Sequence, residues 1–273
     1  RLSFLKSTGT MEILLRPAVP EDADELAALM RNGVTDVVRR ITIIGSPRLS
    51  RFVADSIEGG QDDFVVGTYG DRVVGMCAWR HCGDALQLNH LYLSSKIRGQ
   101  GIGSALVVNG LRKSRRADEC KLSVDVFLDN PVARRWYQSW PMRLEQQFAW
   151  IEFVLPCATE QEAGTCLIEG WAEAEANHIR HGLSRFTLKT SNASFVIGRL
   201  GSRVFRSGNF QILSDPVALQ KLRRLDSKRH LLCVGAVREL AGIKLHSMTT
   251  VAYSERFVGL CSDATTYLTS ALA

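Results

Sequence analysis

The chain has 273 residues, of which 45% are hydrophobic and 23% charged, and its formal net charge is +6. This composition allows an ordinary globular core, and the length suffices for one large domain or two small ones. No uninterrupted apolar run approaches the roughly 18 residues of a membrane span, so none is expected. The mild positive charge suits an anionic small molecule and gives little support for a nucleic-acid partner, which we do not expect.

The cysteines and the start of the chain bear on its compartment. The seven cysteines are an odd number without a C-x-x-C pair, which indicates free thiols in a reducing environment. Residues 1–10 precede Met11 and lack the apolar core and cleavage site of a secretory signal. We therefore interpret them as an expression tag or upstream extension and expect a cytoplasmic protein.

Several elements are predicted before the middle of the chain. Leu14–Ala18 has the pattern of a strand, and Pro20–Ala23 opens a helix with acids in its first turn. Phe64–Gly67 and Val73–Met76, joined through Gly70-Asp71, predict a hairpin.

The segment Arg98-Gly99-Gln100-Gly101-Ile102-Gly103, which we call the glycine loop, is the most informative feature. It follows an apolar strand at Leu86–Leu93 and precedes a helix that is expected to begin near Ser104. Glycines allow main-chain N–H groups to face a ligand, and the helix start adds free donors and a positive dipole end. The loop therefore predicts a phosphate site.

Three readings of the loop compete with a simple turn. A dinucleotide fingerprint would require glycine at position 104, where the chain has Ser104, and no P-loop string occurs. The pattern R-x-x-G-x-G remains. Its flanks are Leu88–Leu93, a strand candidate at Leu122–Phe127, and Asn130–Tyr137, which reads N-x-x-A-x-x-x-Y. In that last segment Asn130 can cap a helix whose first residue is Pro131.

Together, these segments resemble the GCN5-related N-acetyltransferases (GNAT) over residues 11–155. The resemblance implies an α+β (mixed α/β) fold with a mostly antiparallel twisted sheet flanked by helices. It implies an acetyl-CoA-dependent N-acetyltransferase that transfers the acetyl group directly to a primary amine, with acetyl-CoA as cosubstrate and no metal. We expect acetyl-CoA and an amine acceptor as partners, no membrane, and a monomer or homodimer.

The resemblance also assigns residues to the cofactor. The loop grips the pyrophosphate of coenzyme A, and a main-chain N–H in the strand before it polarises the acetyl oxygen. The implied cofactor-binding residues are Leu91, Tyr92, Leu93, Arg98, Gly99, Gln100, Gly101, Ile102, Gly103, Ser104, Asn130 and Ala133.

Two residues are candidates for proton transfer. Tyr137 matches the family tyrosine near the sulfur, where a phenol can protonate a departing thiolate; otherwise it is a half-buried tyrosine at a helix end. Many relatives place an acid in the strand before the loop, but this chain has Asn89 and His90 there. His90 is the candidate base, or else a packed strand histidine. Because strand residues alternate between faces, we expect only one of these two to face the cleft.

The acceptor cannot be read from the sequence. Relatives continue after the tyrosine with x-x-x-G-F, whereas this chain has Trp140-Pro141-Met142, which alters the turn into the closing strands. Peptide, polyamine, aminoglycoside and amino-acid acceptors all stay open. Four arginines before residue 60 would suit an acidic acceptor, although solvated helix positions explain them better; they are Arg39, Arg40, Arg48 and Arg51.

Residues 156–273 have no second glycine loop but echo the first half. The echoes are Phe153–Ala158 with Glu160–Ala163 for Ile13–Ala23, Phe195–Gly198 with Gly201–Val204 for the hairpin, and Leu225–Lys228 for Leu93–Lys96. A duplicated fold that has lost its cofactor loop and an unrelated α+β domain are both compatible. The helix expected after Ser214 counts against duplication, because the repeat would place a strand there.

Two further alternatives concern the chemistry. The cluster Glu173, Glu175, His178 and His181, late in a helix ending at Gly182, lacks metal-binding spacing and is better explained as a polar helix face. For the whole chain, the alternative to an enzyme is a non-catalytic module that binds acyl-CoA as a regulatory ligand or serves interactions.

Overall fold

The computed structural model describes residues 3–6, 12–157, 164–241 and 248–272. The chain divides into two compact units, each of which is discontinuous in sequence. The first consists of Arg1–Val34, Ser50–Gln146 and Glu255–Ala273, and the second of Thr35–Leu49 and Gln147–Ser254. The sequence suggested a single boundary near residue 155, whereas each compact unit combines separate segments of the chain.

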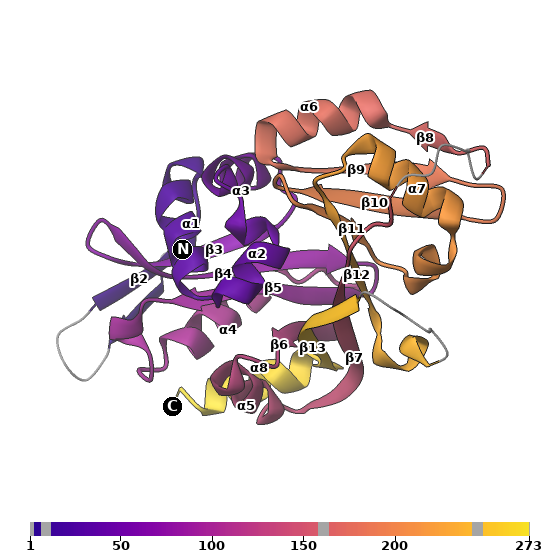
Figure 1. Ribbon diagram of the computed structural model, residues 1–273. Coiled ribbons are helices and arrows are strands. Elements are labelled where there is room, and N and C mark those ends of the chain that lie inside the picture. The colour runs from indigo at the N-terminus through magenta and orange to yellow at the C-terminus, as the bar shows by residue number, and fades with distance from the viewer. Residues whose placement is uncertain (1–2, 7–11, 158–163, 242–247, 273) are drawn as a thin grey trace. The chain divides into compact units, whose positions relative to one another are not determined.

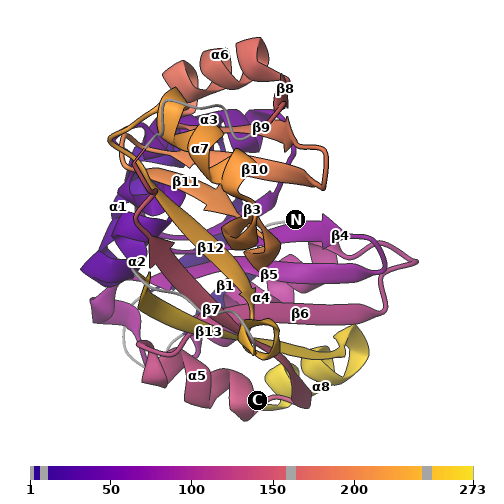
Figure 2. The ribbon, with the colours of Figure 1, turned by 45° about the vertical axis from the view of Figure 1, so that its right-hand side comes forward.

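The first unit is a sheet with the strand order β1-β2-β3-β4-β5-β6-β13-β7 (Figures 1 and 2). Its elements are β1 (Ser3–Lys6), β2 (Glu12–Pro17), η1 (Pro20–Asp22), α1 (Ala23–Asn32), α3 (Leu49–Glu58), β3 (Asp63–Tyr69), β4 (Arg72–Cys82), β5 (Ala85–Leu93), η3 (Ser95–Ile97), α4 (Ile102–Ser114), β6 (Lys121–Phe127), α5 (Pro131–Gln138), the start of β7 (Met142–Phe153), the end of β13 (Met248–Leu260) and α8 (Cys261–Ser270). Pairs from β1 to β5 are antiparallel, and β5 pairs with β6 in parallel.

The elements predicted for the first half are confirmed. The helix α1 follows the turn at Pro20, and the hairpin β3–β4 turns at Gly70, whose φ is 57°. The helix α4 begins at Ile102, two residues before the predicted start. Asn130 caps α5, since its Oδ1 accepts a hydrogen bond from the Ala133 N–H at 3.1 Å.

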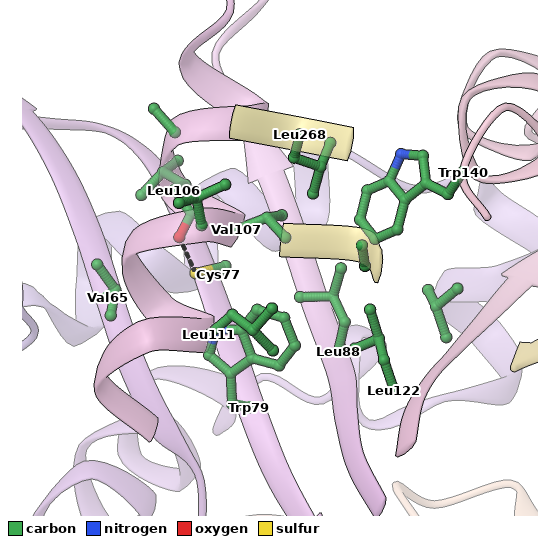
Figure 3. Packing of buried hydrophobic residues seen from close by; sticks show 14 of the residues in the cluster. Val65, Cys77, Trp79, Leu88, Leu106, Val107, Leu111, Leu122, Trp140 and Leu268 are labelled. Atoms are coloured by element: carbon green, nitrogen blue, oxygen red, sulfur yellow. Dashed lines mark hydrogen bonds between the residues drawn. The ribbon is translucent and has the colours of Figure 1, made fainter. Parts of the chain in front are cut away.

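A hydrophobic core beneath α4 stabilises the first unit (Figure 3). Cys77 and Trp79 of β4 lie under this helix, and the Cys77 thiol donates to the Leu106 carbonyl oxygen at 3.3 Å. Leu268 of α8 packs into the same cluster. Gly110 allows α4 to approach this closely, because a Cβ atom there would overlap the Trp79 indole nitrogen.

The second unit has the strand order β13-β7-β12-β11-β10-β9-β8. Besides the shared strands, its elements are α2 (Asp36–Ile41), η2 (Ile43–Gly45), β8 (Leu167–Glu169), α6 (Trp171–His181), β9 (Leu183–Lys189), β10 (Ser194–Leu200), β11 (Val204–Ser207), η4 (Phe210–Ser214), α7 (Pro216–Leu225), β12 (His230–Ala236) and η5 (Val237–Leu240). The core of this unit lies around Phe186, Ile197, Phe205 and Leu231, all nearly inaccessible to solvent.

The order of elements in the second unit repeats that in the first. Strand, helix, three antiparallel strands, helix and a parallel strand follow one another as β8, α6, β9–β11, α7 and β12. The corresponding series is β2, α1, β3–β5, α4 and β6. The inference that the helix after Ser214 argues against duplication was wrong, because α7 occupies the position of α4 between two parallel strands.

The individual sequence echoes were also misplaced. Phe153 ends β7, and the first strand of the repeat is β8, ten residues beyond Cys157. The hairpin expected at residues 195–204 forms, but as β10–β11 it corresponds to β4–β5. Leu225 ends a helix, whereas Leu93 ends a strand. The helix start expected at residues 160–163 lies outside the described residues.

Each unit contains a strand from the other half of the sequence. In the first unit the last strand of the chain, β13, lies beside β6, and in the second unit β7 lies beside β12. One long strand, β7, thus supplies residues to both units.

Candidate active site in the first unit

The glycine loop joins η3 to α4 and has the backbone of an anion site. Gly99 and Gly101 have φ values of 76° and 75°, in the left-handed region that favours glycine. The N–H of Ala105 donates to the Gly101 carbonyl oxygen at 3.0 Å and closes the first turn of the helix. The N–H groups of residues 102–104 therefore have no carbonyl partner within the helix and are directed out of its N-terminus.

Side chains of the loop hold its shape. The Nε and Nη2 atoms of Arg98 both donate to the Leu93 carbonyl oxygen at 3.2 Å, and the Gln100 amide donates to the Lys96 carbonyl oxygen at 3.1 Å. Ile102 is buried in the core and anchors the first turn of α4. Arg98, Gly99, Gln100 and Gly101 are exposed, so an incoming phosphate group can reach the main-chain donors.

The strands β5 and β6 separate next to this loop. Their parallel pairing runs from Ala85 opposite Lys121 to Leu88 opposite Val124, while β5 continues to Leu93 and β6 to Phe127. The other edge of β5 stays paired with β4 up to Leu93. The last part of β5 therefore has one open edge.

Main-chain donors point into this opening. The Ser94 N–H donates to the Val74 carbonyl oxygen of β4 at 2.8 Å, so residue 94 faces the paired edge. Because N–H groups of successive strand residues point to opposite edges, those of Leu91 and Leu93 face the open edge. The Leu93 carbonyl oxygen, which accepts from Arg98, lies on the same edge.

A β-bulge changes the faces of β5. Ala78 lies opposite His90 and Trp79 opposite Leu88, which leaves Asn89 as an extra residue. Before the bulge the even-numbered Leu86 and Leu88 face the core beneath α4. Beyond the bulge the odd-numbered Leu91 and Leu93 pack against that core instead. The expectation that alternation allows only one of Asn89 and His90 to face the cleft does not hold at such a bulge.

His90 and Asn89 share a cluster with two residues that the sequence analysis missed. Asp62 accepts hydrogen bonds from Arg80 Nε and Nη2 at 2.8 Å each, and from the Asn89 side chain at 2.8 Å. Burial lowers the pKa of His90 to about 4, while the charge of Asp62 raises it and that of Arg80 lowers it. We call Asp62, Arg80, Asn89 and His90 the acceptor-side cluster. No motif marks Asp62; only its position before a strand that ends in a hairpin gives a signal.

The pKa values of the two tyrosines of the site are both raised. Tyr137 is buried among aromatic rings, with the Trp140 ring centroid at 5.2 Å. Burial raises its pKa above the ordinary range, and the charges of Tyr92 and Cys77 raise it further. Tyr92 packs against Gly33 at the end of α1, and burial raises its pKa as well.

The remaining candidates are placed less centrally. Asn130 is exposed at the start of α5, while Ala133 and Ser104 are partly buried. The four arginines considered for an acidic acceptor have local partners: Arg39 lies 3.3 Å from Asp36, Arg40 lies 3.5 Å from Glu152, Arg51 lies 3.0 Å from Asp55, and Arg48 donates to the His178 carbonyl oxygen at 3.4 Å.

Among its described residues, the second unit has neither feature of this site at the equivalent positions. Where α4 follows the glycine loop, α7 follows η4, whose Phe210 and Ile212 are buried. The Asp215 carboxylate occupies the helix start, accepting from the Ala218 N–H at 2.9 Å and the Thr190 hydroxyl at 2.7 Å. All four residues of β11 pair with β12, so no edge opens.

The described residues contain neither a candidate metal site nor a candidate membrane-spanning helix. No group of three or more His, Cys, Asp or Glu side chains within them has the arrangement of a metal site. Among the helices of that same part of the chain, none is both long enough and apolar enough to cross a membrane. All seven cysteines are free thiols.

Comparisons with known proteins agree with the fold. Residues 41–140 match the model of the acetyltransferase (GNAT) family. Similar structures include a tandem GNAT protein from the clavulanic acid biosynthesis pathway, solved without acetyl-CoA (TM-score 0.61, 13% identity, 91% of this chain and 98% of that chain covered). A GCN5-related N-acetyltransferase from Kribbella flavida has a TM-score of 0.55 at 12% identity, with 92% of this chain and 71% of that one covered.

A third similar structure is an acetyltransferase candidate from Pyrococcus horikoshii, with a TM-score of 0.65, 14% identity, and 94% and 91% of the two chains covered. At these identities the likeness concerns the fold, and it extends over both units. No curated protein matches the chain by sequence.

Proposed function

The chain carries a domain of the acetyltransferase (GNAT) family at residues 41–140, and from this premise we propose that it is an acetyl-CoA-dependent N-acetyltransferase acting on a primary amine. The observation that supports this most is the opening between β5 and β6 beside the glycine loop. A pyrophosphate bound at the loop would leave the pantetheine arm to follow the open edge of β5.

The loop supplies the grip on the cofactor. Its N–H groups at residues 102–104, together with the positive end of the α4 dipole, favour a doubly charged pyrophosphate. Arg98 keeps Nη1 available beyond its bonds to Leu93, so it can add a charge-assisted contact. Both contacts hold the substrate in place before the reaction begins.

The open edge supplies electrostatic stabilisation. When the amine attacks the thioester carbon, a C–N bond forms and the carbonyl oxygen becomes an oxyanion. The Leu91 N–H is directed into the opening and would donate to that oxygen, so its interaction strengthens as charge develops. Collapse of the intermediate re-forms the carbonyl and breaks the C–S bond, with the sulfur leaving as a thiolate.

Tyr137 would protonate the departing thiolate. Burial raises the pKa of its phenol, so the phenol is protonated at neutral pH and has a proton to donate when the thiolate leaves. The proton of the acceptor amine passes to His90 or to water. Burial keeps the His90 imidazole neutral above about pH 5, and its lowered pKa also makes it a weaker base than a free imidazole.

The test is thioester consumption with a panel of amines, followed as free thiol released and as acetylated amine by mass spectrometry. In Tyr137→Phe we expect kcat to fall by about 100-fold or more, the usual size of a lost general acid, with acetyl-CoA affinity unchanged. The matched control is Tyr69→Phe, at a phenol that is 47% exposed, and should keep full activity.

The outcomes separate the two readings of the chain. Release of thiol in step with acetylated amine supports an enzyme. A wild-type protein that binds acetyl-CoA but acetylates no amine is instead an acyl-CoA-binding module.

A further inference from the structure

The charges and hydrogen bonds of the acceptor-side cluster indicate which chemical class of acceptor fits the site. Asp62, Arg80 and Asn89 come from just before β3, from β4 and from the bulge of β5, and so form a row across three neighbouring strands. Trp79 points into the core beneath α4, so Arg80 lies on the opposite face of the sheet. The glycine loop leads into α4 on one face of the sheet. On the opposite face α1 packs against β4 and β5, but the Arg80 side chain stays partly exposed, so an acceptor can reach it from that side.

The single carboxylate of this cluster, that of Asp62, already accepts hydrogen bonds from Arg80 and Asn89. One Asp62 oxygen accepts from Arg80 Nε, and the other accepts from Arg80 Nη2 and Asn89 Nδ2, all at 2.8 Å. The Asp62 side chain is only 5% exposed. A second ammonium group on the acceptor would therefore find no accessible carboxylate within the cluster, which disfavours polycationic acceptors.

Arg80, in contrast, has donors left over. A guanidinium has five N–H donors, and Asp62 takes one from Nε and one from Nη2. No contact of the described residues uses Nη1. The side chain is 43% exposed, so the Nη1 edge is open to solvent on the acceptor face. The bidentate bond to Asp62 fixes the plane of the guanidinium and thus the direction in which this edge points.

We propose that the acceptor carries a carboxylate near the amine that is acetylated, and that Arg80, oriented by Asp62, binds this carboxylate. The inference rests on the proposed function and narrows its acceptor to amino acids and similar amino-carboxylates. In this assignment Arg80 determines specificity, and Asp62 is a positioning residue that acts through Arg80.

The test uses amine pairs that differ only by a carboxylate, namely lysine with cadaverine and phenylalanine with phenethylamine. We expect the carboxylate member of at least one pair to have a kcat/KM at least 10-fold higher. In Arg80→Met this ratio should fall to about 1, through a higher KM for the carboxylate member, while the affinity for acetyl-CoA stays the same. Arg80→Lys should restore part of the preference, and Asp62→Asn should weaken it.

The matched control is Arg16→Met. Arg16 forms the same bidentate pair with a buried carboxylate, Asp22, at 2.7 and 2.8 Å, but on β2 at the far side of β3. Its loss should leave the preference intact. Equal kcat/KM within every pair, or a preference that survives Arg80→Met, overturns this inference alone. Absence of any acetylated amine overturns the proposed function as well.

Discussion

Among the loop residues, Gly101 has the clearest requirement for glycine, because its φ of 75° favours glycine. It also directly precedes the free N–H groups of α4. In Gly101→Asp we expect acetyl-CoA affinity to fall at least 10-fold, because the carboxylate would repel the pyrophosphate and compete for the helix N–H groups. Calorimetric titration measures this directly.

Gly70→Asp is the matched control for this substitution. Gly70 has a φ of 57° at the tip of the β3–β4 hairpin, with open space around its α-carbon, so both variants bear a similar backbone strain of about 1 kcal/mol. Only the loop variant should lose affinity. If both variants bind equally well, the pyrophosphate does not lie in this loop.

His90 should make stability depend on pH. Its pKa in the folded state is about 4, below the 6.5 of a free imidazole, so between these values the unfolded chain binds a proton that the folded chain does not. The free energy of unfolding should therefore fall as the pH is lowered from about 6.5 to 4. In His90→Gln, urea denaturation across this window should show a shallower decline.

A second histidine contributes to the same window and gives an internal check. Burial, together with Arg199 and Arg229, lowers the pKa of His178 to about 4. The single substitutions at positions 90 and 178 should each remove part of the slope, and the double variant should remove more. A slope unaffected by His90→Gln would show that this imidazole is not kept neutral by burial.

At the scale of elements, the packing of α4 on β4 depends on Gly110. Alanine ordinarily favours a helix over glycine by about 1 kcal/mol, but here its Cβ would overlap the Trp79 ring and lie 3.0 Å from the Cys77 sulfur. We expect Gly110→Ala to destabilise the protein by about 1–3 kcal/mol, the usual range for an overpacked core, measured by urea denaturation.

A double-mutant cycle isolates this contact. In a Trp79→Leu background the overlap disappears, so adding Gly110→Ala should then be neutral or stabilising. An equal loss of stability in both backgrounds would mean that the helix does not approach β4 this closely.

Element by element, the first half was predictable because its signals are local. A capped helix start at Asn130-Pro131 and a turn at Gly70 follow from a few adjacent residues. The bulge at Asn89 could not be predicted, because the alternation of strand residues does not indicate where an extra residue is inserted. Asp62 and Arg80 are 18 residues apart and meet only because β3 and β4 pair in one register, so no motif records them.

At the scale of the whole chain, the repeat was recognisable but misaligned. Sequence similarity between hairpins pointed to β10–β11 as the partner of β3–β4, whereas the order of elements matches it to β4–β5. The exchange of β7 and β13 depends on pairing between distant residues, 78 to 88 positions apart for β7 with β12 and more than 100 for β13 with β6, which no local pattern encodes. The strand order of the structure was needed to match the hairpins of the two halves and to place β7 and β13.

The two units have different capacities for a cofactor. The first has a glycine loop and an open strand edge, whereas the second fills the equivalent helix start with Asp215 and buried apolar side chains. The duplicated fold therefore predicts a single acetyl-CoA site in each chain.

Calorimetric titration of acetyl-CoA into the wild-type protein tests the central claim most directly. We expect one site per chain, retained in Asp215→Asn and lost in Gly101→Asp. Two sites per chain, or binding to a well-folded protein that Gly101→Asp leaves unchanged, would contradict the assignment of the cofactor to the opening between β5 and β6, and so would the absence of binding.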